Sequence, residues 1–254
     1  MSNPGPFSLE GKIALITGST RGIGLGIARA MQAAGAQVVV SNDDAADTAR
    51  AAKTLGCRGI AADVADDAAL AALIAETVAQ CGGLDIVVGN AGITGAPGGI
   101  AALDMADYDC VMAINLRAQV VLTKLARSHL VARGGGSIIL IASLSALRGN
   151  AAISSYALAK AGVAQLARNL AVEWGPHNIR TNAISPGLIR TELSGPLLAN
   201  EAFMAKRLQM TPLRRVGEID EVAGAAVFLA SPAGAFINGH NLVIDGGTRI
   251  TDGN

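Results

Sequence analysis

The chain has 254 residues, of which 51% are hydrophobic, so it can bury the core of one large domain. Its 20 basic and 20 acidic residues cancel to zero net charge, which gives no electrostatic reason to expect a nucleic acid or a membrane surface as a partner. Residues 1–12 lack the basic-then-apolar pattern of a secretory signal, and no stretch of about twenty residues is apolar enough to predict a membrane span.

The cysteines and histidines are few and scattered. Cys57, Cys81 and Cys110 are odd in number and lack the spacing of a disulfide framework or a zinc site. They are typical of free thiols in a reducing compartment, so we expect a cytoplasmic protein. The three histidines are dispersed along the chain, and we therefore expect no metal site.

Short apolar runs alternate with amphipathic segments along the chain. Strands are predicted over 12–17, 37–41, 58–64, 84–92, 137–143, 179–187 and 241–245. Helices are predicted over 23–35, 44–56, 66–82, 104–131, 154–174 and 218–230. Near-continuous apolar strands separated by helices predict a parallel sheet covered on both faces. We therefore expect one doubly wound α/β domain of the Rossmann type, with about seven strands, over residues 1–254.

One segment breaks this alternation. Residues 191–217 are apolar in patches and contain Pro196 and Pro212. We interpret the segment as a mobile excursion over the end of the sheet, where it would contact the substrate. An ordinary helical insertion with no role in binding is the alternative.

The stretch STRGIG directly follows the first predicted strand. It leaves Gly18, Gly22 and Gly24 between that strand and the first helix. In an open α/β sheet this turn borders the crevice that binds nucleotides. Glycines let the backbone approach a pyrophosphate there, and the N–H groups of the helix favour negative charge. The spacing GxxxGxG alone is also compatible with a turn that binds nothing.

Polar residues after the second predicted strand bear on the choice of cofactor. Asn42, Asp43 and Asp44 lie where a doubly wound dinucleotide site contacts the adenosine ribose. A carboxylate there accepts both ribose hydroxyls and repels a 2′-phosphate, although one aspartate is suited to capping the next helix. Arg21 instead favours NADP, because a guanidinium can pair with the 2′-phosphate of that cofactor. The balance favours NAD, with NADP as the alternative.

Tyr156 and Lys160 are four residues apart on the predicted helix 154–174, so their side chains share one face. A nearby ammonium stabilises a phenolate, which predicts a lowered pKa for Tyr156 and a role as general acid/base. Ser143 ends the preceding strand, and its hydroxyl could hold the substrate oxygen beside Tyr156. A tyrosine and a lysine on a helix surface are also common without any catalytic role.

Taken in order, these motifs form a specific set. The set comprises Thr17, Gly18, Gly22, Ile23, Gly24, Asn90, Ala91, Gly92, Asn115, Ser143, Tyr156, Lys160, Pro186 and Gly187. It resembles the short-chain dehydrogenase/reductase family, in its shorter classical branch, over about residues 9–248. The resemblance implies that Tyr156 is the general acid/base, that Lys160 tunes it and binds ribose, and that Ser143 donates to the substrate oxygen. It also implies that Asn115 holds a water in the proton relay to Lys160.

The resemblance also implies the contacts to the cofactor. Asp63 and Val64 would contact adenine, Asn90, Ala91 and Gly92 would flank the riboses, and Ile189 and Thr191 would contact the nicotinamide carboxamide. The other expected cofactor-binding residues are Gly18, Thr20, Arg21, Gly22, Ile23, Gly24, Asn42, Asp43, Tyr156, Lys160, Pro186 and Gly187. Gly89 departs from the family, since many relatives have asparagine there, and Asn42 replaces the aspartate frequent in NAD-using relatives. The closing segment 236–247 resembles one that packs between subunits, which implies a homotetramer.

The implied reaction is reversible hydride transfer between a nicotinamide cofactor and a small-molecule secondary alcohol or ketone. A dinucleotide-binding sensor or scaffold without turnover is the alternative, but it would not need Ser143, Tyr156 and Lys160. Dehydration or epimerisation on the same fold would demand further acid/base groups, which the sequence does not reveal. The substrate does not follow from the sequence. Arg148 could meet a carboxylate or a phosphate, although a solvated surface arginine is the more common case.

Overall fold

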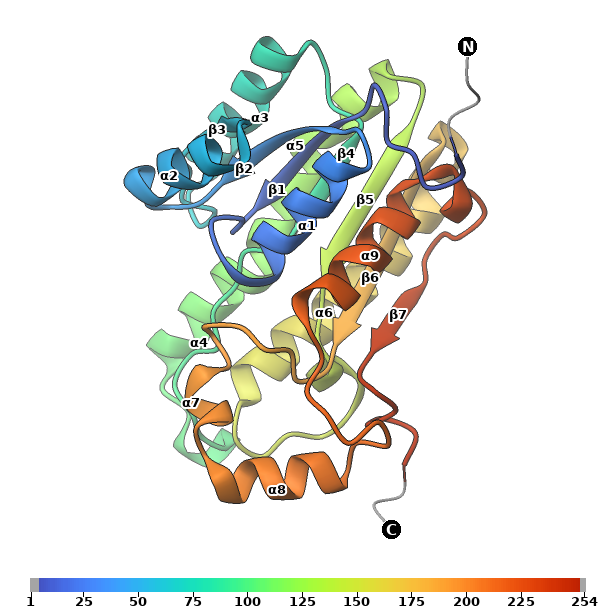
Figure 1. The fold of residues 1–254 in the computed structure, drawn as a ribbon. Coiled ribbons are helices and arrows are strands. Elements are labelled where there is room, and N and C mark those ends of the chain that lie inside the picture. The colour runs from blue at the N-terminus through green and yellow to red at the C-terminus, as the bar shows by residue number, and fades with distance from the viewer. Residues whose placement is uncertain (1–4, 252–254) are drawn as a thin grey trace.

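Seven parallel strands form one sheet in the computed structural model, which describes residues 5–251 (Figure 1). The strands are β1 (Ile13–Thr17), β2 (Gln37–Ser41), β3 (Arg58–Gly59), β4 (Ile86–Gly89), β5 (Gly136–Ile141), β6 (Ile179–Pro186) and β7 (Asn241–Ile244). Their order across the sheet is β3-β2-β1-β4-β5-β6-β7. The chain thus winds outward from β1 to one edge and then returns to build the other half, which is the doubly wound topology that the sequence predicts.

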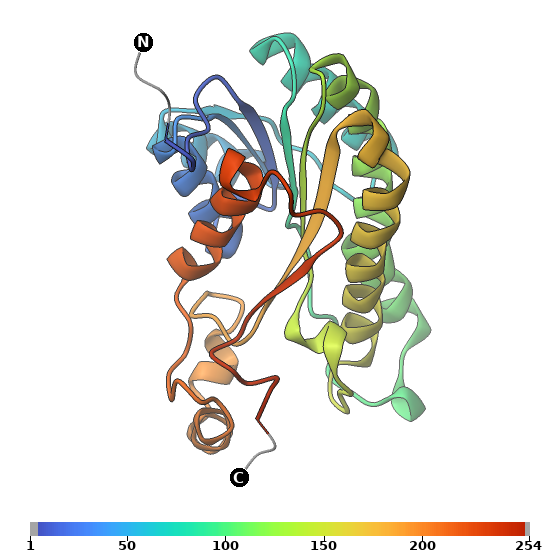
Figure 2. The same ribbon diagram turned by 90° about the vertical axis from the view of Figure 1, so that its right-hand side faces the viewer.

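Helices cover both faces of the sheet (Figure 2). They are α1 (Gly22–Ala33), α2 (Ala45–Leu55), α3 (Asp67–Cys81), α4 (Met105–Met112), α5 (Ala118–Ala132), α6 (Ser154–Trp174) and α9 (Ile219–Ala230). Along β1, Leu15 packs into a core with α3, α5 and α6, whereas Ala14 and Ile16 pack into a second core with α1, α2 and α9. Because both faces of the strand are buried, its sequence is a continuous apolar run.

Capping residues set the ends of two of the helices. Asp44 accepts a hydrogen bond from the backbone N–H of Asp47 at 2.7 Å and begins α2, which ends at Gly56 with φ of +64°. Asp66 caps α3 in the same way, and that helix ends at Gly82 with φ of +85°. Aspartate is favoured at the start of a helix, and glycine is favoured in the left-handed region just after its end.

Two predicted elements differ from the structure. Only Arg58–Gly59 of the segment 58–64 is a strand, although the N–H groups of Ile60 and Ala62 still donate to the carbonyl oxygens of Val40 and Asn42 at 3.0 and 2.9 Å. The chain then turns at Asp63, whose carboxylate accepts from the N–H of Ala65 at 2.9 Å. The predicted helix 104–131 is interrupted by a π-helical turn, Ala113–Arg117, between α4 and α5. A π turn adds one residue within a continuing helix, which apolar periodicity does not reveal.

The segment 191–217 lies across the end of the sheet, at the bottom of Figure 1. It contains the short helix α7 (Gly195–Leu198) and the helix α8 (Glu201–Gln209). Among residues 5–251, no helix combines the length and the apolar character needed to cross a membrane. The two ends of the segment 191–217 are held close together, since the N–H of Arg190 donates to the carbonyl oxygen of Gly217 at 2.9 Å.

Candidate active site

The predicted site residues meet where parallel strands end. Gly18 follows β1, Asn90 follows β4, Ser143 lies two residues after β5, and Gly187 follows β6. These strands are neighbours in the sheet, so their carboxyl ends share one edge. This is the edge at which doubly wound proteins bind ligands.

The glycines after β1 are required by close backbone packing. Gly18 and Gly22 have φ of +60° and +56°, a region that strains other residues. A Cβ on Gly18 would lie 2.7 Å from the Cα of Ala91, and one on Gly24 would lie 2.3 Å from the carbonyl oxygen of Gly18. A side chain at position 18 or 24 would therefore displace the turn.

Two polar side chains hold this turn in place. The amide of Asn90 donates to the carbonyl oxygens of Thr17 and Gly18 at 3.0 and 2.8 Å. Ser19, which is fully buried, donates through its hydroxyl to Ile16 at 2.7 Å and accepts from the N–H of Ser41 at 2.9 Å. The turn after β1 is thereby tied both to β4 and to the end of β2. Sequence reasoning did not single out Ser19.

The start of α1 has polar groups without protein partners. Its first residue is preceded by Arg21, whose side chain does not cap the helix, and its first turn contains no acidic residue. The hydroxyl of Thr20 is buried and finds no hydrogen-bond partner among the described residues. A helix start with free N–H groups, a glycine turn and an orphaned hydroxyl fits the pyrophosphate of a dinucleotide.

Asp43 and Asp44, which follow β2, have different surroundings. Asp44 caps α2, which confirms that one of the two aspartates serves the helix. Asp43 remains exposed, and its carboxylate accepts from the N–H of Asp44 at 3.1 Å. Arg21 lies 3.9 Å from Asp47, which also pairs with Arg50. A carboxylate and a guanidinium thus both lie near the predicted ribose site.

The residues predicted to contact adenine and nicotinamide follow β3 and β6, respectively. Asp63 is exposed and Val64 half-buried, in the turn that follows β3. Thr191, beyond β6, lies beside Gly22, since a Cβ on that glycine would be 3.8 Å from its side chain. Ser194 fixes this stretch, because its hydroxyl donates to the carbonyl of Ile189 at 2.7 Å. Ser194 was not predicted from the sequence.

Tyr156, Lys160 and Ser143 converge as predicted. The ammonium of Lys160 lies 5.7 Å from the centroid of the Tyr156 ring, one turn along α6. Lys160 is only 3% exposed, and its Nζ donates to the carbonyl oxygen of Ile141 at 2.7 Å. A hydrogen bond joins the side chains of Tyr156 and Ser143. The hydroxyl and the phenol can therefore act on one substrate oxygen.

The direction of the pKa shift at Tyr156 corrects the sequence prediction. Burial raises the pKa of Tyr156, and the hydrogen bond with Ser143 offsets this rise only in part. Burial also lowers the pKa of Lys160 to about 8, because an ammonium without water around it is poorly stabilised. In the protein without cofactor, desolvation of the phenolate therefore outweighs the neighbouring ammonium, and the predicted lowering of the Tyr156 pKa is wrong.

Asn115 lies in the π-helical turn, and its side chain lies next to Gly92, as does that of Lys160. Its amide donates to the carbonyl of Ile93 at 2.7 Å and accepts from the N–H of Ile93 at 2.8 Å. A Cβ on Gly92 would lie 2.8 Å from the Oδ1 of Asn115 and 3.4 Å from the Nζ of Lys160. Asn115 and Lys160 therefore flank the same glycine, and π turns are frequent at functional sites.

Gln119 explains how the chain tolerates Gly89. A Cβ on Gly89 would lie 1.8 Å from the Oε1 of Gln119, so this amide occupies the space of the missing side chain. The Nε2 of Gln119 donates to the carbonyl oxygen of Ala91 at 3.4 Å. Gln119 thus supports the turn after β4 from α5. No sequence pattern predicts this contact, because Gly89 and Gln119 are thirty residues apart.

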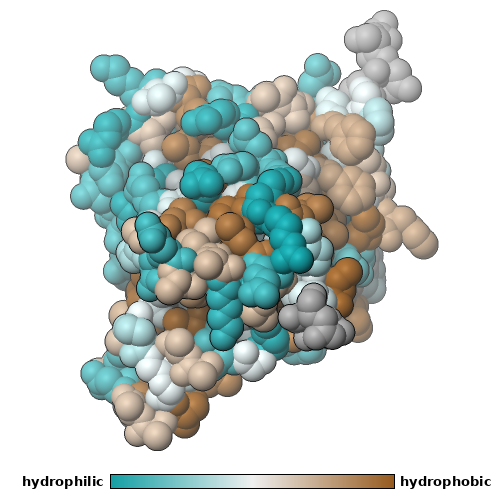
Figure 3. All heavy atoms as spheres, turned by 60° about the horizontal axis from the view of Figure 1, so that its bottom comes forward, coloured by the Kyte–Doolittle hydropathy of each residue, from teal (hydrophilic) through white to brown (hydrophobic). Residues whose placement is uncertain are grey.

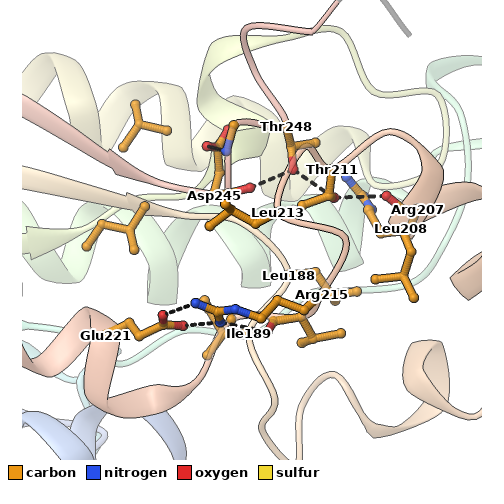
Figure 4. A pocket seen from close by; sticks show the side chains of 16 residues that line it. Leu188, Ile189, Arg207, Leu208, Thr211, Leu213, Arg215, Glu221, Asp245 and Thr248 are labelled. Carbon is orange, nitrogen blue, oxygen red and sulfur yellow. Dashed lines mark hydrogen bonds and ion pairs between the residues drawn. The ribbon is translucent and has the colours of Figure 1, made fainter. Parts of the chain in front are cut away.

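A cavity of about 250 Å³ lies between α8, the start of α9 and the end of β7 (Figure 4). Arg215 pairs with Glu221 on one wall, and the hydroxyls of Thr211 and Thr248 are 3.0 Å apart on another. Arg207 of α8 lines the cavity as well. No group of three or more histidine, cysteine or acidic side chains suited to a metal occurs among residues 5–251.

Comparison with known proteins identifies the family. A family model described as enoyl-(acyl carrier protein) reductase matches residues 18–249. The gluconate 5-dehydrogenase of Gluconobacter oxydans (strain 621H) is 35% identical over 99% of this chain and 100% of its own. This chain belongs to the short-chain dehydrogenase/reductase family. As a short-chain dehydrogenase/reductase of the classical branch, it is an oxidoreductase that transfers hydride between a nicotinamide cofactor and a secondary alcohol or ketone.

Solved short-chain dehydrogenase/reductase structures share its fold. The gluconate 5-dehydrogenase of Burkholderia cenocepacia J2315, in complex with NADP and tartrate, superposes with a TM-score of 0.94 at 36% identity, over 97% of this chain and 98% of its own. A 7α-hydroxysteroid dehydrogenase, in complex with NADH and 7-oxo glycochenodeoxycholic acid, superposes with a TM-score of 0.91 at 36% identity over the same shares. Both nicotinamide cofactors therefore occur among proteins similar to this one.

Proposed function

We propose that this short-chain dehydrogenase/reductase interconverts a hydroxy acid and the corresponding keto acid, with Tyr156 as general acid/base. The observation that carries the proposal is the convergence of Ser143, Tyr156 and Lys160 beside a glycine turn with unsatisfied polar groups. The gluconate 5-dehydrogenase relatives support a sugar acid as the substrate class. A protein that only bound a dinucleotide would have no use for the phenol of Tyr156 beside the buried ammonium of Lys160.

Four residues take part in the proposed proton transfer: Ser143, Tyr156, Lys160 and Asn115. In the oxidative direction, the phenolate of Tyr156 accepts the proton of the substrate hydroxyl, while Ser143 holds the same oxygen by a hydrogen bond. Lys160 favours the phenolate through its positive charge, and Asn115 aligns a water that carries the proton onward. The nicotinamide cofactor, when bound, accepts the hydride. In the reductive direction, Tyr156 returns the proton to the carbonyl oxygen.

The cofactor is proposed to lie along the residues that the sequence selects. The start of α1 with Gly18, Thr20, Gly22 and Gly24 would bind the pyrophosphate. The remaining proposed contacts are Asp63 and Val64 to adenine, Asn90, Ala91, Gly92 and Lys160 to the riboses, and Pro186, Gly187, Ile189 and Thr191 to the nicotinamide. Ile23 would pack beside the turn.

For cofactor choice we propose NAD, because Asp43 is exposed at the ribose position and Arg21 is engaged by Asp47. Asp43→Ala should lose NAD preference, whereas Arg21→Ala should leave NAD use intact and weaken any use of NADP. The cofactor preference is measured as the ratio of the rates with NADH and NADPH, in the wild type and in both variants. A wild type that prefers NADPH, and that loses this preference in Arg21→Ala, would reverse the assignment.

The experiment for the reaction is a panel of secondary alcohols and ketones, assayed in both directions with each cofactor. The panel should include sugar acids, polyols, cyclic alcohols and 3-oxoacyl compounds. We expect turnover of gluconate-like acids, lost in Tyr156→Phe. Dinucleotide binding without turnover of any member would contradict the proposal.

A further inference from the structure

Ser194 immediately precedes α7, and it is only 9% exposed. A serine at the start of a helix usually accepts a hydrogen bond from an N–H group of that helix, but the side chain of Ser194 does not cap α7. Its hydroxyl instead donates to the carbonyl oxygen of Ile189 at 2.7 Å and accepts from the N–H of Thr191 at 3.0 Å. The side chain of Ser194 therefore bonds back to the stretch that carries Ile189 and Thr191, the two proposed nicotinamide contacts.

Ser194 also orients the side chain of Thr191. The two hydroxyl oxygens are 3.2 Å apart, and the N–H of Ser194 donates to the Oγ1 of Thr191 at 3.3 Å. Thr191 in turn lies beside the glycine turn, because a Cβ on Gly22 would be 3.8 Å from its side chain. The hydroxyl of Thr191 is thus fixed next to the turn at which we propose that the pyrophosphate binds.

Gly217 holds the same stretch through the backbone. Its carbonyl oxygen accepts from the N–H of Arg190 at 2.9 Å, and its N–H donates to the carbonyl oxygen of Leu188 at 3.0 Å. A Cβ on Gly217 would lie 2.6 Å from the Cδ1 of Ile189, which is 5% exposed. Ile189 is therefore fixed by Gly217 through its two neighbours and by Ser194 through its own carbonyl oxygen.

The helices that follow contribute little to fixing this stretch. Neither α7 nor α8 has a buried side chain, and the face that carries them is a mixture of hydrophilic and hydrophobic residues (Figure 3). The position of residues 188–191 therefore depends on hydrogen bonds rather than on packing from these helices. Removal of the Ser194 hydroxyl would leave the carbonyl oxygen of Ile189 and the N–H of Thr191 without this partner, and unsatisfied buried groups are costly.

We propose that Ser194 is a positioning residue for the nicotinamide end of the cofactor, which acts through Ile189 and Thr191. This inference rests on the proposed function, in which those two residues contact the nicotinamide. The adenosine and the pyrophosphate are assigned there to the turns after β1, β2 and β3, none of which bonds to Ser194. The effect of losing the Ser194 hydroxyl is therefore confined to the nicotinamide half of the dinucleotide.

The experiment compares ligands with and without the nicotinamide ring. NAD, NADH and ADP-ribose are titrated by calorimetry into the wild type and into Ser194→Ala. We expect the Kd of NAD and of NADH to rise by ~10-fold or more in the variant, and that of ADP-ribose to change by less than ~2-fold. If NADP is the preferred cofactor, NADP, NADPH and 2′-phospho-ADP-ribose take their places. Equal losses for all three ligands would show a general structural role and would contradict the proposal.

Two further variants separate the hydroxyl from its surroundings. Ser194→Thr keeps the hydroxyl and should hold the Kd of NADH within ~3-fold of the wild type. Glu192→Gln is the matched control, since it changes an exposed side chain two residues away and should alter none of the three affinities. A loss in Ser194→Thr as large as that in Ser194→Ala would show that the hydroxyl is not the cause.

Fluorescence gives a readout of the nicotinamide itself. The emission of NADH depends on the surroundings of its reduced ring, so at saturating NADH the emission from Ser194→Ala should lie closer to that of free NADH than the emission from the wild type does. Identical emission from the two proteins would contradict the proposal. None of these measurements needs turnover. Failure of the wild type to bind any dinucleotide would refute the proposed function together with this inference, whereas equal binding by the wild type and Ser194→Ala would refute this inference alone.

Discussion

Tyr156 is half-buried, hydrogen-bonded to Ser143 and adjacent to Lys160, so its phenol is the group expected to move the proton. Tyr156→Phe removes only that oxygen. We expect kcat to fall by ~10²- to 10⁴-fold, the usual contribution of a general acid/base, with little change in dinucleotide affinity. Steady-state rates and calorimetric titration measure the two effects. Tyr108→Phe is the matched control, and equal activity of Tyr156→Phe and the wild type would remove the proposed role.

Because the pKa of Tyr156 is raised in the protein without cofactor, we expect bound oxidised cofactor to lower it. The phenol must lose its proton in oxidation, so the positive charge of the oxidised nicotinamide should lower this pKa. The chain has two tyrosines, and a Tyr108→Phe variant leaves Tyr156 as the sole reporter. Ultraviolet titration should show tyrosinate forming at lower pH once oxidised cofactor is added. An unchanged titration curve would mean that the cofactor does not tune the phenol.

Lys160 should make stability depend on pH in a defined window. Its pKa is lowered from 10.5 to about 8 on folding, so between these values the unfolded chain binds more protons than the folded one. The contribution of Lys160 to the free energy of unfolding therefore rises with pH across this window. Denaturant unfolding of the wild type and Lys160→Met at pH 7 to 10 should show the difference growing in favour of the wild type. A difference that does not vary with pH would contradict the lowered pKa.

Among the elements, the turn after β4 depends on a pair of residues that sequence reasoning could not connect. Gly89→Asn should clash with Gln119 and lower both stability and dinucleotide affinity, since an added Cβ would lie 1.8 Å from its Oε1. The double variant Gly89→Asn with Gln119→Ala frees that space, so it should recover part of the loss. A double-mutant cycle on Tm and Kd measures the coupling, and strictly additive effects would rule it out.

Signals within a few residues of each other, such as helix caps, predict most helices and strands. They do not predict irregular features such as the π-helical turn. Asp44 and Gly56 bound α2 by capping chemistry that acts within a few residues, which is why the sequence locates this helix. The π turn at Ala113–Arg117 has no such signal, because its extra residue is stabilised by contacts of Asn115 with the distant Ile93. For the same reason the roles of Ser19, Ser194 and Gln119 emerge only from the fold. The raised pKa of Tyr156 likewise depends on burial, which motif spacing does not measure.

For the molecule as a whole, the strand order and the two apolar layers follow from chain order and from strands buried on both faces. The oligomeric state does not follow from chain order or strand burial, and it stays a prediction. Exposed apolar side chains on α5 and α6 include Val120, Val131, Leu158 and Val172, the last 83% exposed. Apolar surface of this kind is typical of subunit contacts.

We therefore expect a homotetramer, with a mass four times the 25.5 kDa of the chain in light scattering. Val172→Glu places a charge among these apolar side chains and should lower that mass. Glu173→Gln alters the neighbouring position without adding a buried charge, and it should leave the mass unchanged. A wild type of single-chain mass at micromolar concentration would contradict the expectation.

The tie that Ser19 makes between Ile16 and Ser41 has a practical consequence for protein engineering. One small hydroxyl sets the distance between the glycine turn, where we propose that the pyrophosphate binds, and the loop after β2, where we propose that the adenosine ribose binds. We therefore expect that residues 42 and 43 can be exchanged to change the cofactor preference, with Asp44 retained as the cap of α2. Because Ser19 is fully buried, the longer side chain in Ser19→Asn should push the two loops apart and weaken the binding of NAD and NADP alike.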